Sequence, residues 1–107
     1  MSFSIRRPAV AGTWYPGTAP TLAAAVDAHL AAAGAVPDVD ELVALVAPHA
    51  GLMYSGPVAA HAFSLLRGRR IDLAVLVGPS HFVAFDGVSI YAGDGFDTPF
   101  GPVTLVT

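Results

Sequence analysis

The chain has 107 residues, of which 54% are hydrophobic and 12% are charged, and this balance indicates one globular domain and excludes a disordered chain. The net charge of −3 and the absence of a long basic run argue against a nucleic-acid partner. The sequence contains no cysteine, which excludes disulfides, thiolate metal ligands and a cysteine nucleophile from these residues.

The sequence contains no segment of the kind that enters or crosses a membrane. Its longest aliphatic run, LVALVA at residues 42–47, is far shorter than the roughly 20 residues that cross a bilayer. The N-terminal residues MSFSIRRPAVAG contain two arginines but no apolar stretch of signal-peptide length after them. We therefore expect a cytoplasmic protein without a membrane partner.

The first predicted element is a helix that follows a turn-rich N-terminal segment. Prolines and glycines are frequent in residues 1–17, which predicts an ordered series of turns. Beyond them, Leu22, Val26 and Leu30 recur every four residues, the spacing of one helix face, and Gly34 supplies a stop. A polar connector with a proline follows this helix.

Two aliphatic runs on either side of a second helix predict a βαβ unit. Residues 42–47 and 71–78 are short and continuously apolar, as expected of strands buried on both faces of a parallel sheet. The second helix is predicted to open with Pro57 and to continue through Leu66, so that a right-handed crossover joins the two strands. Residues 87–93 predict a third strand. The expected fold class is α/β, with a parallel-sheet βαβ core and flanking helices.

The end of the sequence leaves this predicted sheet with open edges. Residues 103–107, VTLVT, begin another apolar pattern without a closing helix. Exposed apolar strand edges pair with other chains. We therefore expect a homo-oligomeric or aggregation-prone chain, or a single domain over residues 1–107 that is the N-terminal part of a larger α/β domain and is incomplete at its C-terminus.

Two of the four histidines occupy matching places in this pattern. His49 follows the first aliphatic run in APHAG, and His81 follows the second run in GPSHF, 32 residues later. Neighbouring strands lie about 4.8 Å apart and a metal accepts imidazole nitrogens at about 2.0–2.1 Å, so rings at adjacent strand ends can converge on one ion. Open α/β sheets also bind ligands at the carboxyl ends of their strands. We predict a shared metal or substrate site at His49 and His81.

Two hydroxyl-bearing residues near these histidines are candidates for acting on a substrate. Tyr54 follows His49 by five residues and can direct its hydroxyl into the same crevice, although an aromatic side chain packed in its loop is an equal alternative. Ser80 directly precedes His81, and we expect it to help to position a bound molecule. Tyr54 and Ser80 are therefore the predicted catalytic residues.

The remaining acids and histidines have simpler interpretations. Asp86, Asp94 and Asp97 are the nearest downstream carboxylates, but each lies in a glycine-rich turn, where aspartate is ordinary turn chemistry. His29 and His61 lie among apolar residues on the predicted inward faces of the two helices, which favours hydrogen-bonded core positions over metal ligation.

Four stretches of the sequence carry a resemblance to a known family. They are RRPAVAGTWYP, LVALVAPHAGLMYSGPVAAHAF, LAVLVGPSHF and DTPFG. In this order they resemble the Memo-like protein family, which in prokaryotes is also called AmmeMemoRadiSam system protein B. The resemblance covers essentially all of the chain. It implies an α/β fold similar to that of the class III extradiol dioxygenases, which are non-haem iron enzymes that cleave aromatic rings.

The resemblance also implies a metal site. The histidines of the PHAG and GPSH motifs are metal ligands in the family, and here they are His49 and His81. The family's third ligand is a cysteine far downstream, which this chain does not contain. The resemblance therefore implies an iron or copper cofactor that these residues hold incompletely, a chain that is inactive alone, and an association with radical-SAM and AMMECR-type proteins.

Three hypotheses follow for the function. The leading one is a Memo-like protein with iron or copper at the two histidines, which with its third ligand would be a non-haem metal-dependent oxidoreductase. The second is an extradiol dioxygenase with two histidines and a glutamate on Fe(II); Glu41, the only glutamate, precedes the first predicted strand and argues against it. The third is a non-enzymatic module that binds a peptide or small molecule between Trp14, Tyr15 and Tyr54.

Overall fold

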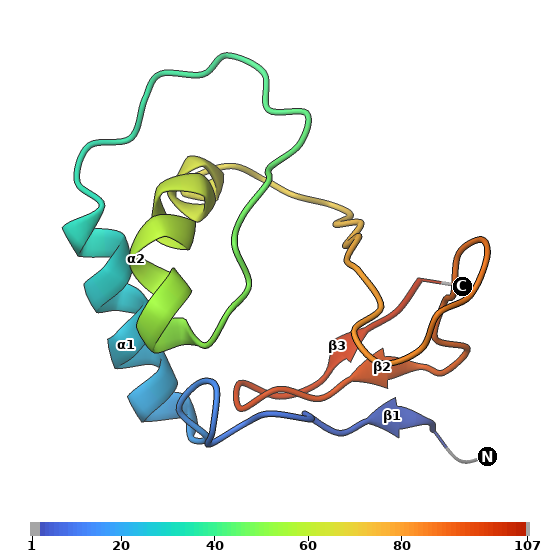
Figure 1. Ribbon diagram of the computed structural model, residues 1–107. Coiled ribbons are helices and arrows are strands. Elements are labelled where there is room, and N and C mark those ends of the chain that lie inside the picture. Colours follow the sequence, from blue (N-terminus) through green and yellow to red (C-terminus); the bar gives the residue numbers. More distant parts are fainter. Residues whose placement is uncertain (1–2, 107) are drawn as a thin grey trace.

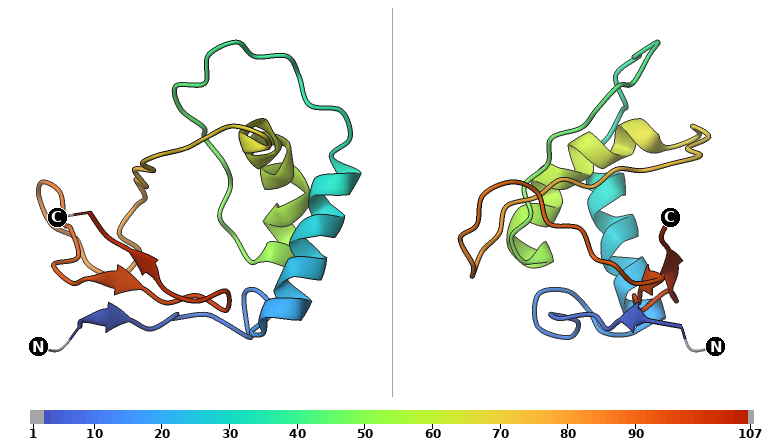
Figure 2. Two further views of the ribbon diagram at one scale, coloured as in Figure 1. Left: turned by 180° about the vertical axis from the view of Figure 1, so that it is seen from behind. Right: turned by 90° about the vertical axis from the view of Figure 1, so that its right-hand side faces the viewer.

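A computed structural model describes residues 3–106, which form a small mixed α/β structure (Figure 1). Two helices lie side by side, and a three-stranded sheet lies on the opposite side of the molecule, close to both ends of the chain (Figure 2). The elements in chain order are β1 (Ile5–Arg6), α1 (Ala19–Ala32), α2 (Leu52–Phe63), the 3-10 helix η1 (Ser64–Leu66), β2 (Gly95–Phe96) and β3 (Val103–Thr104).

Helix α1 confirms the prediction made from its four-residue spacing. Leu22 is buried, while Val26 and Leu30 are half-buried on the same face, which turns toward the inside of the molecule. A proline in the first turn suits the helix start. Gly34 adopts a positive φ of 76°, a conformation that glycine reaches without steric cost, and it lies just beyond the helix end as predicted.

Helix α2 begins earlier than the sequence predicted. It starts at Leu52, so Pro57 lies inside the helix and the predicted start at Pro57 is wrong. The reason is tertiary, because the backbone N–H of Leu52 donates to the carbonyl oxygen of Trp14 at 2.7 Å. The N-terminal segment thereby satisfies a helix-start donor that has no partner within the helix.

The sheet forms from segments that the sequence did not predict to pair. β1 runs parallel to β2, β2 runs antiparallel to β3, and the order is β1-β2-β3. Ile5 lies opposite Gly95, so the pairing joins residues from the two ends of the chain. The strands have two residues each, and backbone hydrogen bonds from Asp94 to Ser4 and from Asp97 to Arg6 extend the parallel pair on either side.

The predicted parallel βαβ core is not formed. Residues 42–47, 71–78 and 87–93 contain no strand, and no backbone hydrogen bond joins these described segments to another part of the chain. Their side chains reach the surface, as Val46 with an exposed fraction of 96% and Leu76 with 90% illustrate. A strand is stable only when a neighbour accepts and donates its ladder of hydrogen bonds, and here none does. The coarser expectation of an α/β structure is confirmed.

The core lies between the two helices and is small. Among residues 3–106, the buried apolar side chains are Leu22 and Ala60, and the buried polar ones are Ser55 and Ser64. Helices α1 and α2 approach closely at Gly56, which is buried and faces the ring of His29. In the same described range, no helix has the length and apolar content that a membrane crossing requires.

Candidate functional site

The structure brings His49 and His81 together. Their Nε2 atoms are 3.2 Å apart, their ring centroids are 5.3 Å apart, and the rings are tilted by 51°. Both side chains are exposed to solvent. The two rings therefore meet as the matching motifs predicted, although the parallel sheet that was expected to align them is absent.

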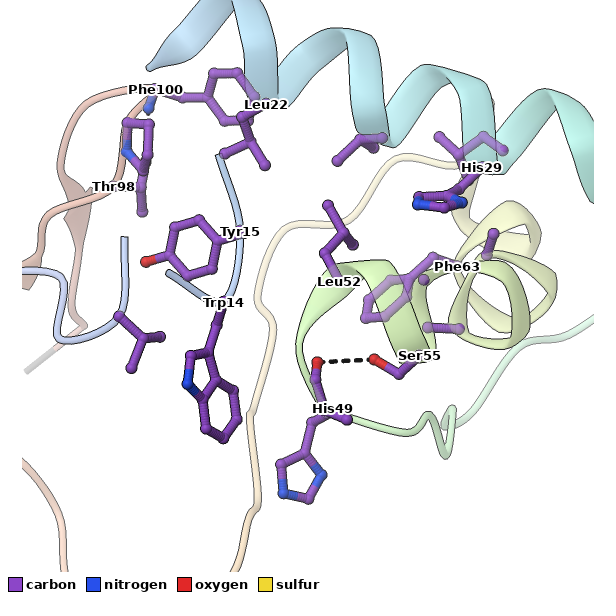
Figure 3. Close-up of a pocket in the computed structure, with 18 of the residues that line it drawn as sticks. Trp14, Tyr15, Leu22, His29, His49, Leu52, Ser55, Phe63, Thr98 and Phe100 are labelled. Atoms are coloured by element: carbon purple, nitrogen blue, oxygen red, sulfur yellow. Dashed lines mark hydrogen bonds between the residues drawn. The ribbon is translucent and has the colours of Figure 1, made fainter. Parts of the chain in front are cut away.

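The loop that carries His49 is fixed from two sides. On one side, the Ser55 hydroxyl donates to the carbonyl oxygen of Ala50 at 2.8 Å. On the other side, Leu52 N–H donates to Trp14, as described above. Figure 3 shows the hydroxyl of Ser55 directed at this loop, with Trp14 on the far side of it.

The loop that carries His81 is closed by its own serine. The Ser80 hydroxyl donates to the carbonyl oxygen of Val83 and accepts from the N–H of Val83 at 3.4 Å. This hydroxyl, predicted to position a substrate, is therefore engaged in its own turn. The Phe82 ring is 6.3 Å from that of His81 and has an exposed fraction of 99%.

Tyr54, the other predicted catalytic residue, lies in the first turn of α2 rather than in a loop. Its side chain has an exposed fraction of 77% and makes no hydrogen bond within residues 3–106. Its ring contacts the position of Gly51, where an added Cβ would be 3.5 Å from Tyr54 Cδ2. The catalytic roles of Tyr54 and Ser80 stay predictions.

The separation of the two imidazole nitrogens fits a shared metal ion. With metal–nitrogen bonds of about 2.0–2.1 Å, a spacing of 3.2 Å corresponds to a nitrogen–metal–nitrogen angle of about 100°, between octahedral and tetrahedral values. Zinc and non-haem iron sites take three or more protein ligands. Across residues 3–106, no group of three or more histidine, cysteine, aspartate or glutamate side chains could hold a metal. The two histidines alone are therefore fewer than the number of protein ligands that such sites take.

The other ionisable residues lie apart from the pair. Asp94 accepts a hydrogen bond from the N–H of Ser4 at 2.6 Å, which is a long-range contact rather than the turn chemistry expected for it. His29 faces α2, in accordance with its predicted inward position. His61 is exposed, so its predicted inward position is wrong.

An apolar cavity of about 790 Å³ adjoins His49. Figure 3 shows it between α1, α2, the N-terminal segment and the turn at residues 98–102, with His49 at one end. Aromatic and aliphatic side chains make up most of its wall, among them Trp14, Tyr15, Leu22, Phe63 and Phe100. The cavity has the composition of a small-molecule site, mainly apolar with a few polar groups.

The carbonyl oxygen of Trp14 anchors the N-terminal segment, and its side chain lines the cavity. The sequence did not indicate that Ser55 contacts the His49 loop, because the helix was predicted to begin at Pro57, beyond Ser55. The cap position of α2 is Gly51. The contribution of Phe100 to the cavity was also missed, although it belongs to the DTPFG stretch quoted above.

The comparisons with a family model and with curated proteins agree on one family. The family model described as Memo-like protein matches residues 6–106. A MEMO1 family protein of Aeropyrum pernix is 37% identical over 110 residues, which cover 94% of this chain and 39% of the relative. A MEMO1 family protein of Methanothermobacter thermautotrophicus is 38% identical over 108 residues, which cover 94% of this chain and 39% of the relative. A MEMO1 family protein of Nitrosopumilus maritimus is 31% identical over 105 residues, which cover 94% of this chain and 38% of the relative.

The match covers almost all of this chain but less than half of the length of each relative. The chain spans 38–39% of the length of the curated relatives named above. No solved structure matches it.

Proposed function

We propose that this chain, which belongs to the Memo-like protein family, binds iron or copper through His49 and His81. The observation that carries the proposal is the 3.2 Å between the two Nε2 atoms. Two unprotonated imidazole nitrogens at this distance can share one ion. The family resemblance supports the same two residues, and it also supports a fold similar to that of the class III extradiol dioxygenases.

The proposed roles of the residues follow from their positions. His49 and His81 would hold the ion from one side, and a ligand from outside residues 3–106 would complete its coordination. A bound redox-active metal supplies oxygen binding or polarisation of a substrate. The apolar cavity beside His49 would take the hydrocarbon part of a substrate and exclude water from it, with Trp14 and Tyr15 forming part of its wall. Tyr54 and Ser80 remain the hydroxyl groups closest in sequence to the pair.

Metal affinity of single-histidine variants tests this proposal. We expect His49→Ala and His81→Ala each to weaken Cu²⁺ or Fe²⁺ binding by at least about 10-fold, because each removes one of two ligands. His61→Ala is the matched control, since His61 is equally exposed but lies on α2 away from the pair. Titration calorimetry on the four proteins measures the effect. Unchanged affinity in both His49→Ala and His81→Ala would refute the proposal.

The cavity favours a second candidate function, a non-enzymatic module that binds a peptide or small molecule. Its 790 Å³ is within the range of about 300–1,000 Å³ of ligand pockets. Binding of an apolar fluorescent dye tests this candidate. We expect Trp14→Ala to weaken dye binding without changing metal content, whereas Phe3→Ala, which removes an exposed aromatic ring outside the cavity wall, leaves it unchanged. Equal effects of the two substitutions would contradict a ligand site at the cavity.

A further inference from the structure

We infer that Ser55 is a positioning residue, which holds the His49 loop in the orientation that lets His49 meet His81. This inference rests on the proposed function, because the pair that Ser55 orients is the proposed metal site. Ser55 does not touch the pair itself. It acts through the backbone of Ala50, the residue directly after His49.

The hydrogen bonding at the start of α2 makes Ser55 the partner of the Ala50 carbonyl. Ala50 precedes the N-cap residue Gly51, so its carbonyl oxygen lies outside the repeating hydrogen bonds of the helix. The backbone N–H groups of Tyr54 and Ser55 donate to the carbonyl oxygen of Gly51, at 2.8 and 3.0 Å, and not to that of Ala50. Within residues 3–106, the hydrogen bond that Ala50 O accepts comes from the Ser55 hydroxyl, at 2.8 Å.

The burial of Ser55 and the backbone angles of Gly51 explain why the bond from the Ser55 hydroxyl to Ala50 O can orient the His49 loop. Ser55 has an exposed fraction of 8%, so its side chain is largely shielded from water, although its acceptor residue Ala50 is exposed. Gly51 has φ and ψ of −49° and 143°, outside the helical region, so the chain changes direction between His49 and α2. The Ser55 bond fixes the peptide group on the His49 side of this change of direction. His49 itself is exposed and has its 3.2 Å contact to His81 as its side-chain hydrogen-bond contact within residues 3–106.

The expected consequence is a loss of metal affinity without a change in the ligands. In metal sites, removal of a group that orients a ligand lowers the metal affinity by about 10–100-fold. We expect Ser55→Ala to weaken Cu²⁺ binding by about 10-fold, since the loop then samples orientations in which His49 is turned away from His81.

Ser64 provides a matched control. Its hydroxyl also donates to a backbone carbonyl, that of Ala60 at 2.6 Å, and its exposed fraction is 3%. Ser64→Ala therefore also removes a bond from a buried serine to a backbone carbonyl, at the far end of α2 from the histidines. Titration of wild type, Ser55→Ala and Ser64→Ala with Cu²⁺ should show weaker binding for Ser55→Ala alone. Circular dichroism of the three proteins compares their helix content.

A second readout without metal separates this inference from the proposed function. Nuclear Overhauser contacts between the ring protons of His49 and His81, whose centroids are 5.3 Å apart, should be present in wild type and Ser64→Ala and lost in Ser55→Ala. If no Cu²⁺ binding depends on His49 and His81, the proposed metal function fails, and the ring contacts still decide the role of Ser55. Ring contacts that persist in Ser55→Ala, or that are lost equally in Ser64→Ala, would overturn the inference.

Discussion

The ring of His29 on α1 lies so close to Gly56 on α2 that a Cβ added at Gly56 would be 2.8 Å from both Cδ2 and Nε2 of His29. The same Cβ would be 3.2 Å from Leu52 Cδ1. Atoms at the first of these distances overlap, so the glycine is what permits α1 and α2 to pack at this point.

This contact predicts whether Gly56→Ala stabilises or destabilises the protein, both in the wild type and in a His29→Ala background. Gly56→Ala should lower the free energy of unfolding by about 1 kcal/mol, because overpacking costs about 1–3 kcal/mol while alanine favours the helix by only about 0.5–1 kcal/mol. In a His29→Ala background the overlap with the ring is gone, and Gly56→Ala should then stabilise by up to about 1 kcal/mol. Urea unfolding of the four proteins measures this cycle. A destabilising Gly56→Ala in both backgrounds would show that another neighbour limits the space.

The bond between Leu52 N–H and the Trp14 carbonyl oxygen predicts how the N-terminal segment is held. Leu52 is the first residue of α2, where proline is tolerated, and the backbone of Gly51 before it is extended as proline requires. Leu52→Pro therefore removes the donor to Trp14, and Leu52→Ala is the control that loses the same side chain but keeps the N–H.

Trp14 is the only tryptophan, so its fluorescence reports directly on this segment. We expect Leu52→Pro to show red-shifted emission, stronger quenching by acrylamide and a loss of about 1 kcal/mol in stability relative to Leu52→Ala. The turn within the N-terminal segment should persist in Leu52→Pro, because its internal hydrogen bonds, such as that from Trp14 N–H to Val10 O, are unchanged. Identical emission and quenching in the two variants would mean that side-chain packing, not this hydrogen bond, holds the segment.

The carboxylate of Asp94 is expected to be structural. It accepts from the Ser4 N–H beside the parallel pair β1 and β2, and hydrogen bonds to charged groups contribute about 1.5–3 kcal/mol. Because Ser4 is exposed, we expect Asp94→Ala to cost about 1 kcal/mol and to leave Cu²⁺ affinity unchanged. Asp86→Ala, at an exposed aspartate, should leave both the stability and the affinity unchanged. A loss of metal affinity in Asp94→Ala would instead identify this residue as a ligand.

Helix α1 could be predicted from the sequence, and the pairing of the strands could not. The start and stop signals and the four-residue spacing of α1 all lie within one segment, so they predict the helix directly. Ile5 and Gly95 pair across 90 residues in strands of two residues, which have no periodicity to recognise. The Ser55 bond to Ala50 was missed for a related reason, because it depends on where α2 begins.

The histidine pair could be predicted because two similar motifs carry it. His49 and His81 each follow an aliphatic run and a proline, and this repetition indicated that they meet. The same runs gave the wrong prediction of a parallel sheet, since apolar composition alone does not supply a hydrogen-bonding neighbour. What the runs do specify is a large exposed apolar surface, with Val46 and Leu76 among the most exposed side chains.

This surface predicts that the isolated chain self-associates. Exposed aliphatic segments with unpaired backbone groups lower their free energy by pairing with another copy, as at open sheet edges. We expect light scattering at increasing concentration to report masses above that of one chain. Val46→Lys combined with Leu76→Lys should return the mass toward that of a monomer, because a charged side chain on each segment opposes close pairing. Val36→Lys, at an exposed valine outside both segments, is the control and should leave association unchanged. A wild-type chain that stays monomeric, or equal effects of all these substitutions, would show that these segments do not drive association.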